Sequence, residues 1–311
     1  MLTHLKINKL FGLYDYDLTF SENQEDKIRF ITATNGYGKS TILRLIDGIF
    51  NQHIEVFFKV PFSELLFEID NAVLRVQQFL TPSIRKENEA DVIDEEDDVN
   101  ISFKLGNIDS EDIKLSRIDV ATKSPNLAAA MKQVQMFFSS ETCKFIDDKR
   151  LLREDAKDSE LVRLADFVGD KLKHPDEDVD RKISVLRDIV NRSDFANKDM
   201  ELSPDFGFRF VSRDESRTKL AMSDLSSGEQ HIMLISLYML FDAPQKAIIL
   251  IDEPEMSFHL SWQGDYLKNL RQIVALQNVQ CIIATHSPII FDSEYELSID
   301  LYDQMHKEEK A

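Results

Sequence analysis

The sequence predicts an α/β protein with a mixed or parallel core sheet, an antiparallel β subdomain and an inserted helical lobe. Two short runs, 247–251 and 279–285, are continuously apolar, as expected for strands buried on both faces of a parallel sheet. Residues 53–105 alternate apolar and polar positions, which predicts antiparallel strands, and residues 126–199 have helical patterns. We expect three domains: an N-terminal lobe over 1–125, a helical insertion over 126–205 and a C-terminal lobe over 206–311.

The composition narrows the class of protein. The chain has 311 residues, of which 43% are hydrophobic, so a sizeable core is expected. Its formal charge of −19 argues against a dedicated nucleic-acid binder, although a local patch remains compatible with it. The acidity is partly local, since residues 87–98 carry a run of carboxylates that we expect to be a solvated loop, but the chain is still acidic without it. Two distant cysteines, no apolar stretch of about 18 residues and no signal-peptide plan predict a cytoplasmic protein without a membrane span.

The first elements surround a glycine-rich segment. Residues 2–32 read as strands around a turn and end in the β-rich run IRFIT. After the glycines, Ile42, Leu45, Ile46 and Ile49 follow the i, i+3, i+4, i+7 spacing of one helical face. A strand, a glycine-rich loop and a helix form the context that a phosphate-binding loop requires.

The segment ATNGYGKST over 33–41 matches the Walker A template, except that Ala33 stands where the first glycine is usual. Its glycines let backbone N–H groups converge on phosphate oxygens. Lys39 would reach the β- and γ-phosphates, and Ser40 would ligate Mg²⁺. The positive end of the following helix adds to this preference for an anion. The candidate ATP-binding residues here are Asn35, Gly36, Gly38, Lys39, Ser40 and Thr41.

A second motif, AIILIDEPE over 247–255, is an apolar strand that ends in two carboxylates. Asp252 is placed to hold Mg²⁺ through water, and Glu253 is the natural candidate to polarise an attacking water. The plain alternative is a strand that ends in acidic turn residues.

Two further motifs support the functional interpretation. In LSSGEQ (225–230), Ser227 and Gly228 open an apolar helix, where N–H groups and a hydroxyl can meet an anion. The structural alternative is a simple helix cap. In IIATHSPII (282–290), His286 follows a buried strand and is a candidate γ-phosphate sensor. The predicted catalytic residues are therefore Lys39, Glu253 and His286.

Together, NGYGKST, LSSGEQ, ILIDEPE and ATHS resemble the ATPase heads of the ABC superfamily. They are more similar to the SMC, RecF and OLD branch than to transporter subunits, and EPEMSFHLSWQ (253–263) resembles OLD-like and stand-alone bacterial ATPases. The resemblance implies hydrolysis of ATP with Mg²⁺ in a head-to-tail homodimer. It also implies that Ser227 and Gly228 contact the nucleotide of the opposite subunit and that residues 255–257 form the dimer-facing D-loop.

Some family positions are not assigned by the sequence. Leu260 stands where relatives often have proline. The Q-loop glutamine has no clear counterpart: Lys149 lies where a glutamine would stand, and Gln77 and Gln78 are rivals. Either Phe11 or Tyr14 could stack on the adenine.

Three functions compete. The resemblance to stand-alone ATPase subunits of Septu-type and retron-linked systems favours an ATPase that regulates a separate effector, such as a nuclease, in anti-phage defence. A RecF- or SMC-like repair ATPase that binds DNA directly is the alternative. A transporter subunit fits poorly, because transporters place their signature much nearer to the phosphate loop than Leu225 lies to Lys39.

The same resemblance indicates which partners to expect. The segment after His286 is too short for a Toprim nuclease domain, so we expect any nuclease to be a separate chain. Basic residues between Lys144 and Arg163 could meet nucleic acid, but they alternate with carboxylates, which favours a solvated face. No membrane partner is expected.

Overall fold

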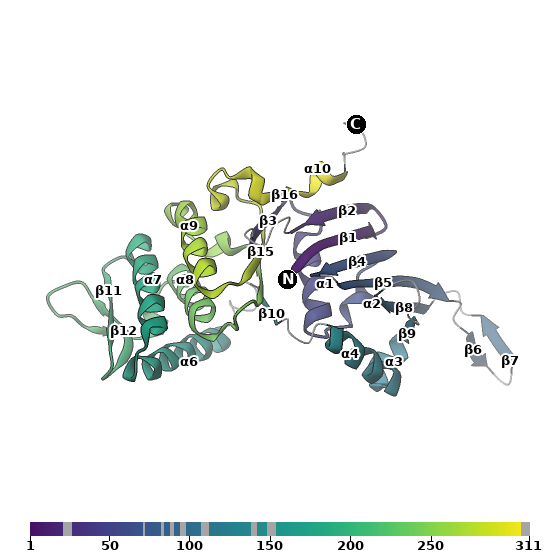
Figure 1. The fold of residues 1–311 in the computed structure, drawn as a ribbon, viewed down its shortest axis with the longest axis horizontal. Coiled ribbons are helices and arrows are strands. Elements are labelled where there is room, and N and C mark those ends of the chain that lie inside the picture. The colour runs from purple at the N-terminus through teal and green to yellow at the C-terminus, as the bar shows by residue number, and fades with distance from the viewer. Residues whose placement is uncertain are drawn as a thin grey trace. The chain divides into compact units, whose positions relative to one another are not determined.

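The computed structural model describes residues 1–20, 27–70, 72–81, 84–87, 90–93, 98–106, 112–137, 142–147 and 154–305. The chain forms two compact units (Figure 1). Unit 1 comprises Met1–Phe145 and Ile299–Ala311, and unit 2 comprises Ile146–Ser298. Among the described residues, no helix is both long and apolar enough to cross a membrane.

Unit 1 is built on an antiparallel sheet with strand order β2-β1-β4-β5-β8-β9. In β4, Leu65, Phe67 and Ile69 are buried while the residues between them are partly exposed, which is the alternation that the sequence shows. This confirms the antiparallel part of the predicted fold. The strands are β1 (Leu2–Leu10), β2 (Tyr14–Thr19), β4 (Glu64–Ile69), β5 (Ala72–Thr81), β8 (Asp98–Leu105) and β9 (Ile113–Ser116).

Two local expectations in this region were wrong. The alternating segment after His53 is not a strand, because Val56–Lys59 form the short helix α2. Phe57 and Phe58 are adjacent and both buried, which one face of a strand does not allow but a helical turn does. Part of the acidic run also pairs, since β6 (Ile84–Glu87) and β7 (Ala90–Ile93) form an antiparallel hairpin instead of a simple loop.

The helix predicted after the glycine-rich loop is present as α1 (Lys39–Phe50). It follows β3 (Ile28–Thr32), and the four apolar residues at helical spacing, Ile42, Leu45, Ile46 and Ile49, are all buried. Burying such a stripe is what holds a helix of this length in place. The other described helices of unit 1 are α3 (Arg117–Thr122), α4 (Pro125–Phe137) and α10 (Leu301–Met305).

Unit 2 combines helices with a parallel strand pair. β14 (Ile248–Asp252) and β15 (Gln280–Thr285) pair in parallel and are buried along their whole length, as their continuous apolar runs predict. The long helices are α6 (Glu154–Lys173), α7 (Glu177–Ser193), α8 (Ser227–Leu237) and α9 (Leu260–Gln277). The structure is thus a mixed α/β fold with parallel and antiparallel strands, as predicted.

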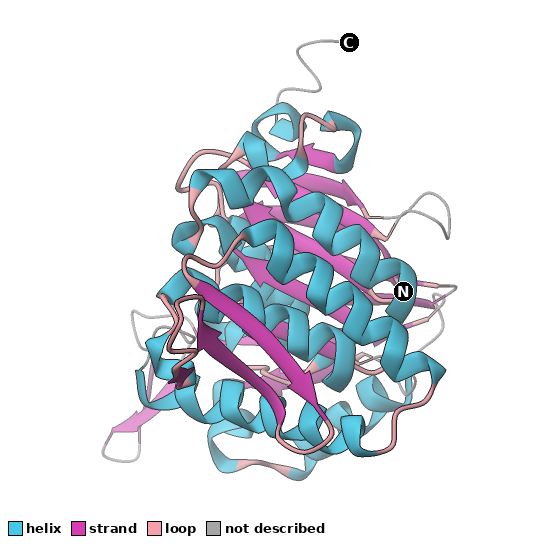
Figure 2. Ribbon diagram, turned by 90° about the vertical axis from the view of Figure 1, so that its left-hand side faces the viewer, coloured by secondary structure: helices cyan, strands magenta, loops and turns pink. Residues whose placement is uncertain are grey.

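An antiparallel hairpin precedes the signature segment. It consists of β11 (Lys198–Ser203), β12 (Gly207–Ser212) and the short β13 (Lys219–Leu220). Figure 2 views unit 2 from the side of this hairpin, with its two long strands in front of the helices. On its inner side, Phe210 stacks on Phe195 and is fully buried, so the hairpin shares a core with the helices.

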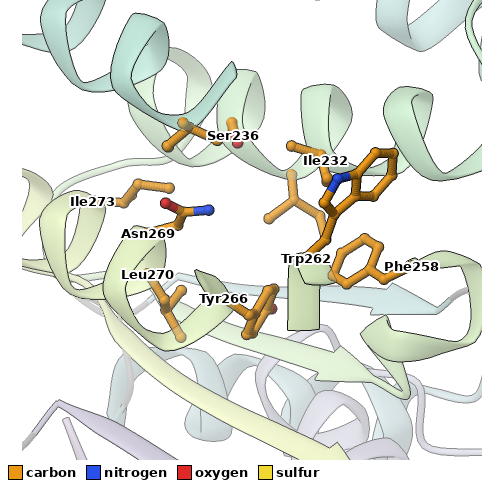
Figure 3. A pocket seen from close by; sticks show the side chains of 10 residues that line it. Ile232, Ser236, Phe258, Trp262, Tyr266, Asn269, Leu270 and Ile273 are labelled. Atoms are coloured by element: carbon orange, nitrogen blue, oxygen red, sulfur yellow. The ribbon is translucent and has the colours of Figure 1, made fainter. Parts of the chain in front are cut away.

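Helices α8 and α9 contribute facing side chains to this core. Figure 3 shows Ile232 and Ser236 of α8 turned toward Trp262, Tyr266 and Ile273 of α9. The space between them is small, about 20 Å³, which is close to the room that one water molecule needs. This supports the interpretation that the apolar stripe of α9 packs in the core and is no ligand surface.

Candidate functional site

The phosphate loop in unit 1 adopts a conformation that only glycine takes readily. Gly36 and Gly38 have φ values of 96° and 91°, in the left-handed region. A Cβ on Gly38 would also lie 2.9 Å from the side chain of Leu10. Glycine is thus favoured at both positions because φ is positive there, and at Gly38 also because a side chain would collide with Leu10.

Lys39 is held against the same loop. Its Nζ donates a hydrogen bond to the carbonyl oxygen of Ala33 at 2.8 Å and lies 3.4 Å from that of Thr34. The side chain is buried, although Thr34, whose carbonyl oxygen the ammonium group approaches, is exposed. A lysine folded over a glycine-rich loop at a helix start brings a positive charge to the amides there, which suits a phosphate group.

Aromatic side chains flank this loop. The ring of Tyr14 stacks on Tyr37 of the loop at 5.7 Å and on Tyr16 at 5.8 Å, and the Tyr16 hydroxyl donates to the Tyr37 carbonyl oxygen at 2.8 Å. Burial raises the pKa of Tyr16, so this hydroxyl stays protonated. Phe11 packs edge-on against Tyr14. Both residues proposed for adenine stacking therefore lie beside the loop.

The two Q-loop candidates that the structure describes, Gln77 and Gln78, are both hydrogen-bonded within unit 1. The Gln78 amide donates to the carbonyl oxygens of Phe57 and Val60, and its oxygen accepts from the Phe62 N–H. Gln77 donates to Glu64. These contacts assign Gln78 to holding the segment after α2. The third candidate, Lys149, lies outside the described residues.

In unit 2, the ends of β14 and β15 bring the predicted acidic residues and the histidine together. Asp252 pairs in register with Ala284, and the Glu253 N–H donates to the Ala284 carbonyl oxygen at 2.8 Å. His286 follows two residues later, with Nδ1 at 3.8 Å from Oε1 of Glu253. Carboxyl ends of parallel strands are where open α/β sheets place ligands.

Glu253 itself has an unusual backbone. Its φ of 46° lies in the left-handed region, which is uncommon for a residue with a long side chain. Such strain is concentrated at functional sites, where surrounding structure holds it in place. Asp252 is buried, whereas the Glu253 side chain is about 29% exposed, so the second carboxylate is the one open to solvent.

Glu255 connects this corner to the histidine. Its Oε1 accepts hydrogen bonds from the Thr285 hydroxyl at 2.6 Å and from the His286 N–H at 3.0 Å, and it lies 3.2 Å from His286 Nδ1. The carboxylate is buried, while the imidazole is about half exposed. From the sequence, Glu255 is predicted only as a D-loop residue, and Thr285 is not among the predicted site residues. The signal that could have pointed to Glu255 is the sequence DEPE over 252–255, which places a further carboxylate two residues after Glu253.

The signature residues open α8 as predicted. Ser226 caps the helix by accepting from the Glu229 N–H, and Glu229 accepts from the Ser226 N–H in return. Ser227 is exposed and Gly228 is buried at the first turn. The buried Glu229 carboxylate also receives two hydrogen bonds from Lys198, each 3.1 Å long. The exposed serine is therefore presented by a rigidly held helix start.

Neither cysteine fits a reactive role. Burial raises the pKa of Cys281 and, together with the nearby Asp47 carboxylate, that of Cys143. Both thiols stay protonated at neutral pH and are weak nucleophiles. Arg163, one of the basic residues proposed to meet nucleic acid, pairs with Glu160 and Asp242 at 2.8 Å. Lys149, the neighbouring arginines 150 and 153, and the side chain of Lys157 lie outside the described part of the chain.

A glycine-rich loop that leads into Lys39 at the start of α1, and paired carboxylates at the end of the buried parallel strand β14, are features of an ATPase-type domain. The family described as "AAA domain, putative AbiEii toxin, Type IV TA system" matches residues 34–292. Since this match spans most of the chain, the protein belongs to that family.

Solved structures show a more distant similarity. The SMC head domain from Thermotoga maritima is 16% identical, with a TM-score of 0.45 over 96% of this chain and 92% of that one. An Smc head from Pyrococcus furiosus, bound to the C-terminal domain of ScpA, is 11% identical with a TM-score of 0.45 (93% and 90% covered). CbiO1 from Clostridium perfringens, part of the ABC transporter complex cbiONQ, is 15% identical with a TM-score of 0.40 (92% and 80%).

Proposed function

We propose that this protein is a cytoplasmic ATPase head that binds and hydrolyses Mg-ATP and closes as a head-to-tail homodimer. The observation that carries the proposal is the arrangement of Glu253, Glu255 and His286 at the ends of β14 and β15. It provides an exposed carboxylate beside an imidazole, which is what activation of a water molecule needs. The phosphate loop of unit 1 is proposed to bind the phosphates.

In this mechanism, the residues of the phosphate loop bind the phosphates of ATP, and the residues at the ends of β14 and β15 activate the attacking water. Lys39 and the amides of the loop neutralise the β- and γ-phosphates, with Asn35, Gly36, Gly38 and Thr41 in the same role. Glu253 accepts the proton of the attacking water, and His286 donates a hydrogen bond to the γ-phosphate. Ser227 and Gly228 of a second copy complete the nucleotide site in trans.

The oxygen donors present suit Mg²⁺. Asp252 offers a buried carboxylate and Ser40 a hydroxyl in the first turn of α1, and Mg²⁺ prefers hard oxygen ligands and retained waters. The ion would be held by Ser40 directly and by Asp252 through water, and it would neutralise charge on the phosphates. Binding of the phosphates and activation of the water are assigned to the side chains named above.

The proposal is tested by ATP hydrolysis and binding in matched variants. Lys39→Ala should abolish nucleotide binding, with the exposed Lys59→Ala as control. Glu253→Gln should keep ATP bound, lose hydrolysis and accumulate a dimer in light scattering, whereas the exposed Glu215→Gln should behave as wild type. Unchanged turnover in Glu253→Gln would remove that residue as the base and overturn the mechanism.

We further propose that the cycle regulates a separate effector, such as a nuclease, in bacterial anti-phage defence. The family description, which names a toxin–antitoxin system, supports a role alongside a second protein. Co-purification with the products of neighbouring genes tests this. A nuclease partner supports it, a membrane permease indicates transport, and salt-dependent DNA binding by the chain alone favours the RecF- or SMC-like alternative.

A further inference from the structure

In unit 2, two residues connect the end of β15 to the short 3₁₀ helix η4 (Pro288–Phe291). They are His286 and Ser287, and we refer to them as the histidine turn. Glu255 holds the first half of this turn, because one of its carboxylate oxygens accepts from the Thr285 hydroxyl and from the His286 N–H. That contact fixes the turn only on the side where the chain leaves β15.

The side chain of Gln263 holds the second half of the histidine turn. Its amide oxygen accepts a hydrogen bond from the Ser287 hydroxyl at 2.7 Å, although the two residues are 24 positions apart in the chain. The N–H of Ser287 is also tied back to the end of β15, since it donates to the Thr285 hydroxyl oxygen at 3.0 Å. His286 is therefore followed, as well as preceded, by a residue whose side chain is hydrogen-bonded.

Helix α9 gives this second support a firm base. Gln263 lies in its first turns, and the helix packs against η4, directly after the histidine turn. Further along α9, Arg271 pairs with Glu294, so the same helix binds the chain on both sides of η4. The contact between Gln263 and Ser287 is partly buried, where water competes less for a hydrogen bond. A side chain on a packed helix is suited to holding a neighbouring loop in one position.

We propose that Gln263 is a positioning residue, which acts through Ser287 to hold the His286 imidazole in place. This ring is about half exposed, and only Nδ1 lies near the buried Glu255, at 3.2 Å, so the direction of the ring depends on the backbone that carries it. Small misplacements of a reacting group lower the rate of a reaction steeply. Supports on both sides of His286 limit such movement. The inference rests on the proposed role of His286 at the γ-phosphate.

Steady-state kinetics test the positioning role. Gln263→Ala should lower kcat for ATP hydrolysis about threefold to tenfold, because one neutral hydrogen bond is lost, and leave the KM for Mg-ATP nearly unchanged. Ser287→Ala removes the donor of the same bond and should have the same effect, whereas Ser287→Thr keeps a hydroxyl and should retain kcat. Gln263→Ala/Ser287→Ala should be no slower than either single variant, and additive losses overturn the proposal.

Gln272→Ala is the matched control for Gln263→Ala. Gln272 lies on the same helix and accepts a hydrogen bond from Arg192 of α7, so this substitution removes an equivalent bond at another place on α9. Its kcat should equal that of wild type. Thermal unfolding of both variants shows whether their stabilities change alike. An equal loss of kcat in the two variants overturns the positioning role of Gln263.

A measurement without ATP separates a failure of this inference from a failure of the ATPase proposal. The chain has seven histidines, so isotope labelling of histidine alone lets hydrogen exchange at the His286 amide be followed by NMR. In the nucleotide-free protein this amide should exchange severalfold faster in Gln263→Ala, and at the wild-type rate in Gln272→Ala and Ser287→Thr. Unchanged exchange in Gln263→Ala overturns the proposal even where ATP is hydrolysed. If the amide responds but wild type does not hydrolyse ATP, Gln263 still positions His286 and only the ATPase proposal fails.

Discussion

Oε1 of Glu255 lies 3.2 Å from Nδ1 of His286 and accepts the backbone N–H of the same residue at 3.0 Å. One carboxylate thus positions both the main chain and the ring of the candidate phosphate sensor. Because Glu255 is buried and His286 is about half exposed, the pair orients an imidazole toward solvent from a fixed support. Glu255 is therefore a positioning residue.

Glu255→Gln should lower kcat for ATP hydrolysis about tenfold or more and leave the KM for Mg-ATP nearly unchanged. The amide oxygen can still accept from Thr285 and from the His286 N–H, so the fold should persist, while the charge facing the ring is lost. Steady-state kinetics and thermal unfolding check this, with the exposed Glu215→Gln as control. A loss of thermal stability large enough to account for the whole loss of activity would indicate a purely structural role.

Gly38→Ala should destabilise unit 1 more than Gly12→Ala. Both glycines have positive φ, 91° and 76°, so each alanine costs about 1–2 kcal/mol of backbone strain. Only the Cβ at Gly38 collides with Leu10, which adds about 1–3 kcal/mol, whereas the space at Gly12 is open. Urea unfolding measures the difference. Equal effects at the two positions would show that the contact with Leu10 relaxes without cost.

Ser227→Arg should prevent dimer closure while a single head still binds ATP. Ser227 is exposed at the start of α8, so a long cation there can be accommodated in the monomer but not against a second copy. Light scattering in the Glu253→Gln background, together with nucleotide binding, checks the prediction. Ser223→Arg is the control, because Ser223 is exposed just before the signature segment. If Ser227→Arg also loses ATP binding, the residue has a structural role within its own head.

Lys198→Ala should destabilise the protein by about 2 kcal/mol or more, since it leaves the buried Glu229 carboxylate without its cation. The comparison is Lys182→Ala, which breaks an i,i+4 pair with the exposed Asp178 and should cost less than about 0.5 kcal/mol. Chemical denaturation gives both values. A similar small effect for Lys198→Ala would mean that water replaces the ammonium at Glu229.

Asp119 should support stability in a pH-dependent way. Hydrogen bonds from Ser124 and Ser116 lower the pKa of Asp119 to about 2 from an ordinary value of 3.8. A lowered pKa stabilises the fold above the unfolded value and loses this contribution as the pH falls from about 4 toward 2. The difference in unfolding free energy between wild type and Asp119→Ala, about 1 kcal/mol at pH 6, should shrink below pH 4.

Elements with strong local patterns were predicted from the sequence. The stripe of Ile42, Leu45, Ile46 and Ile49 specified α1, and the continuous apolar runs specified β14 and β15. By contrast, the alternation around Phe57 suggested a strand where the structure has α2. Short amphipathic segments satisfy either period, and tertiary contacts such as Phe57 with Phe103 decide between them.

The motifs of the phosphate loop, the acidic pair and the helix start at Ser227 are readable from the sequence, because each depends on neighbours along the chain. The contacts of Glu255 with His286 and Thr285, and that of Lys198 with Glu229 31 residues away, are visible only in the folded chain. Those contacts come from strand pairing and helix packing, which bring distant residues together without leaving a local pattern in the sequence.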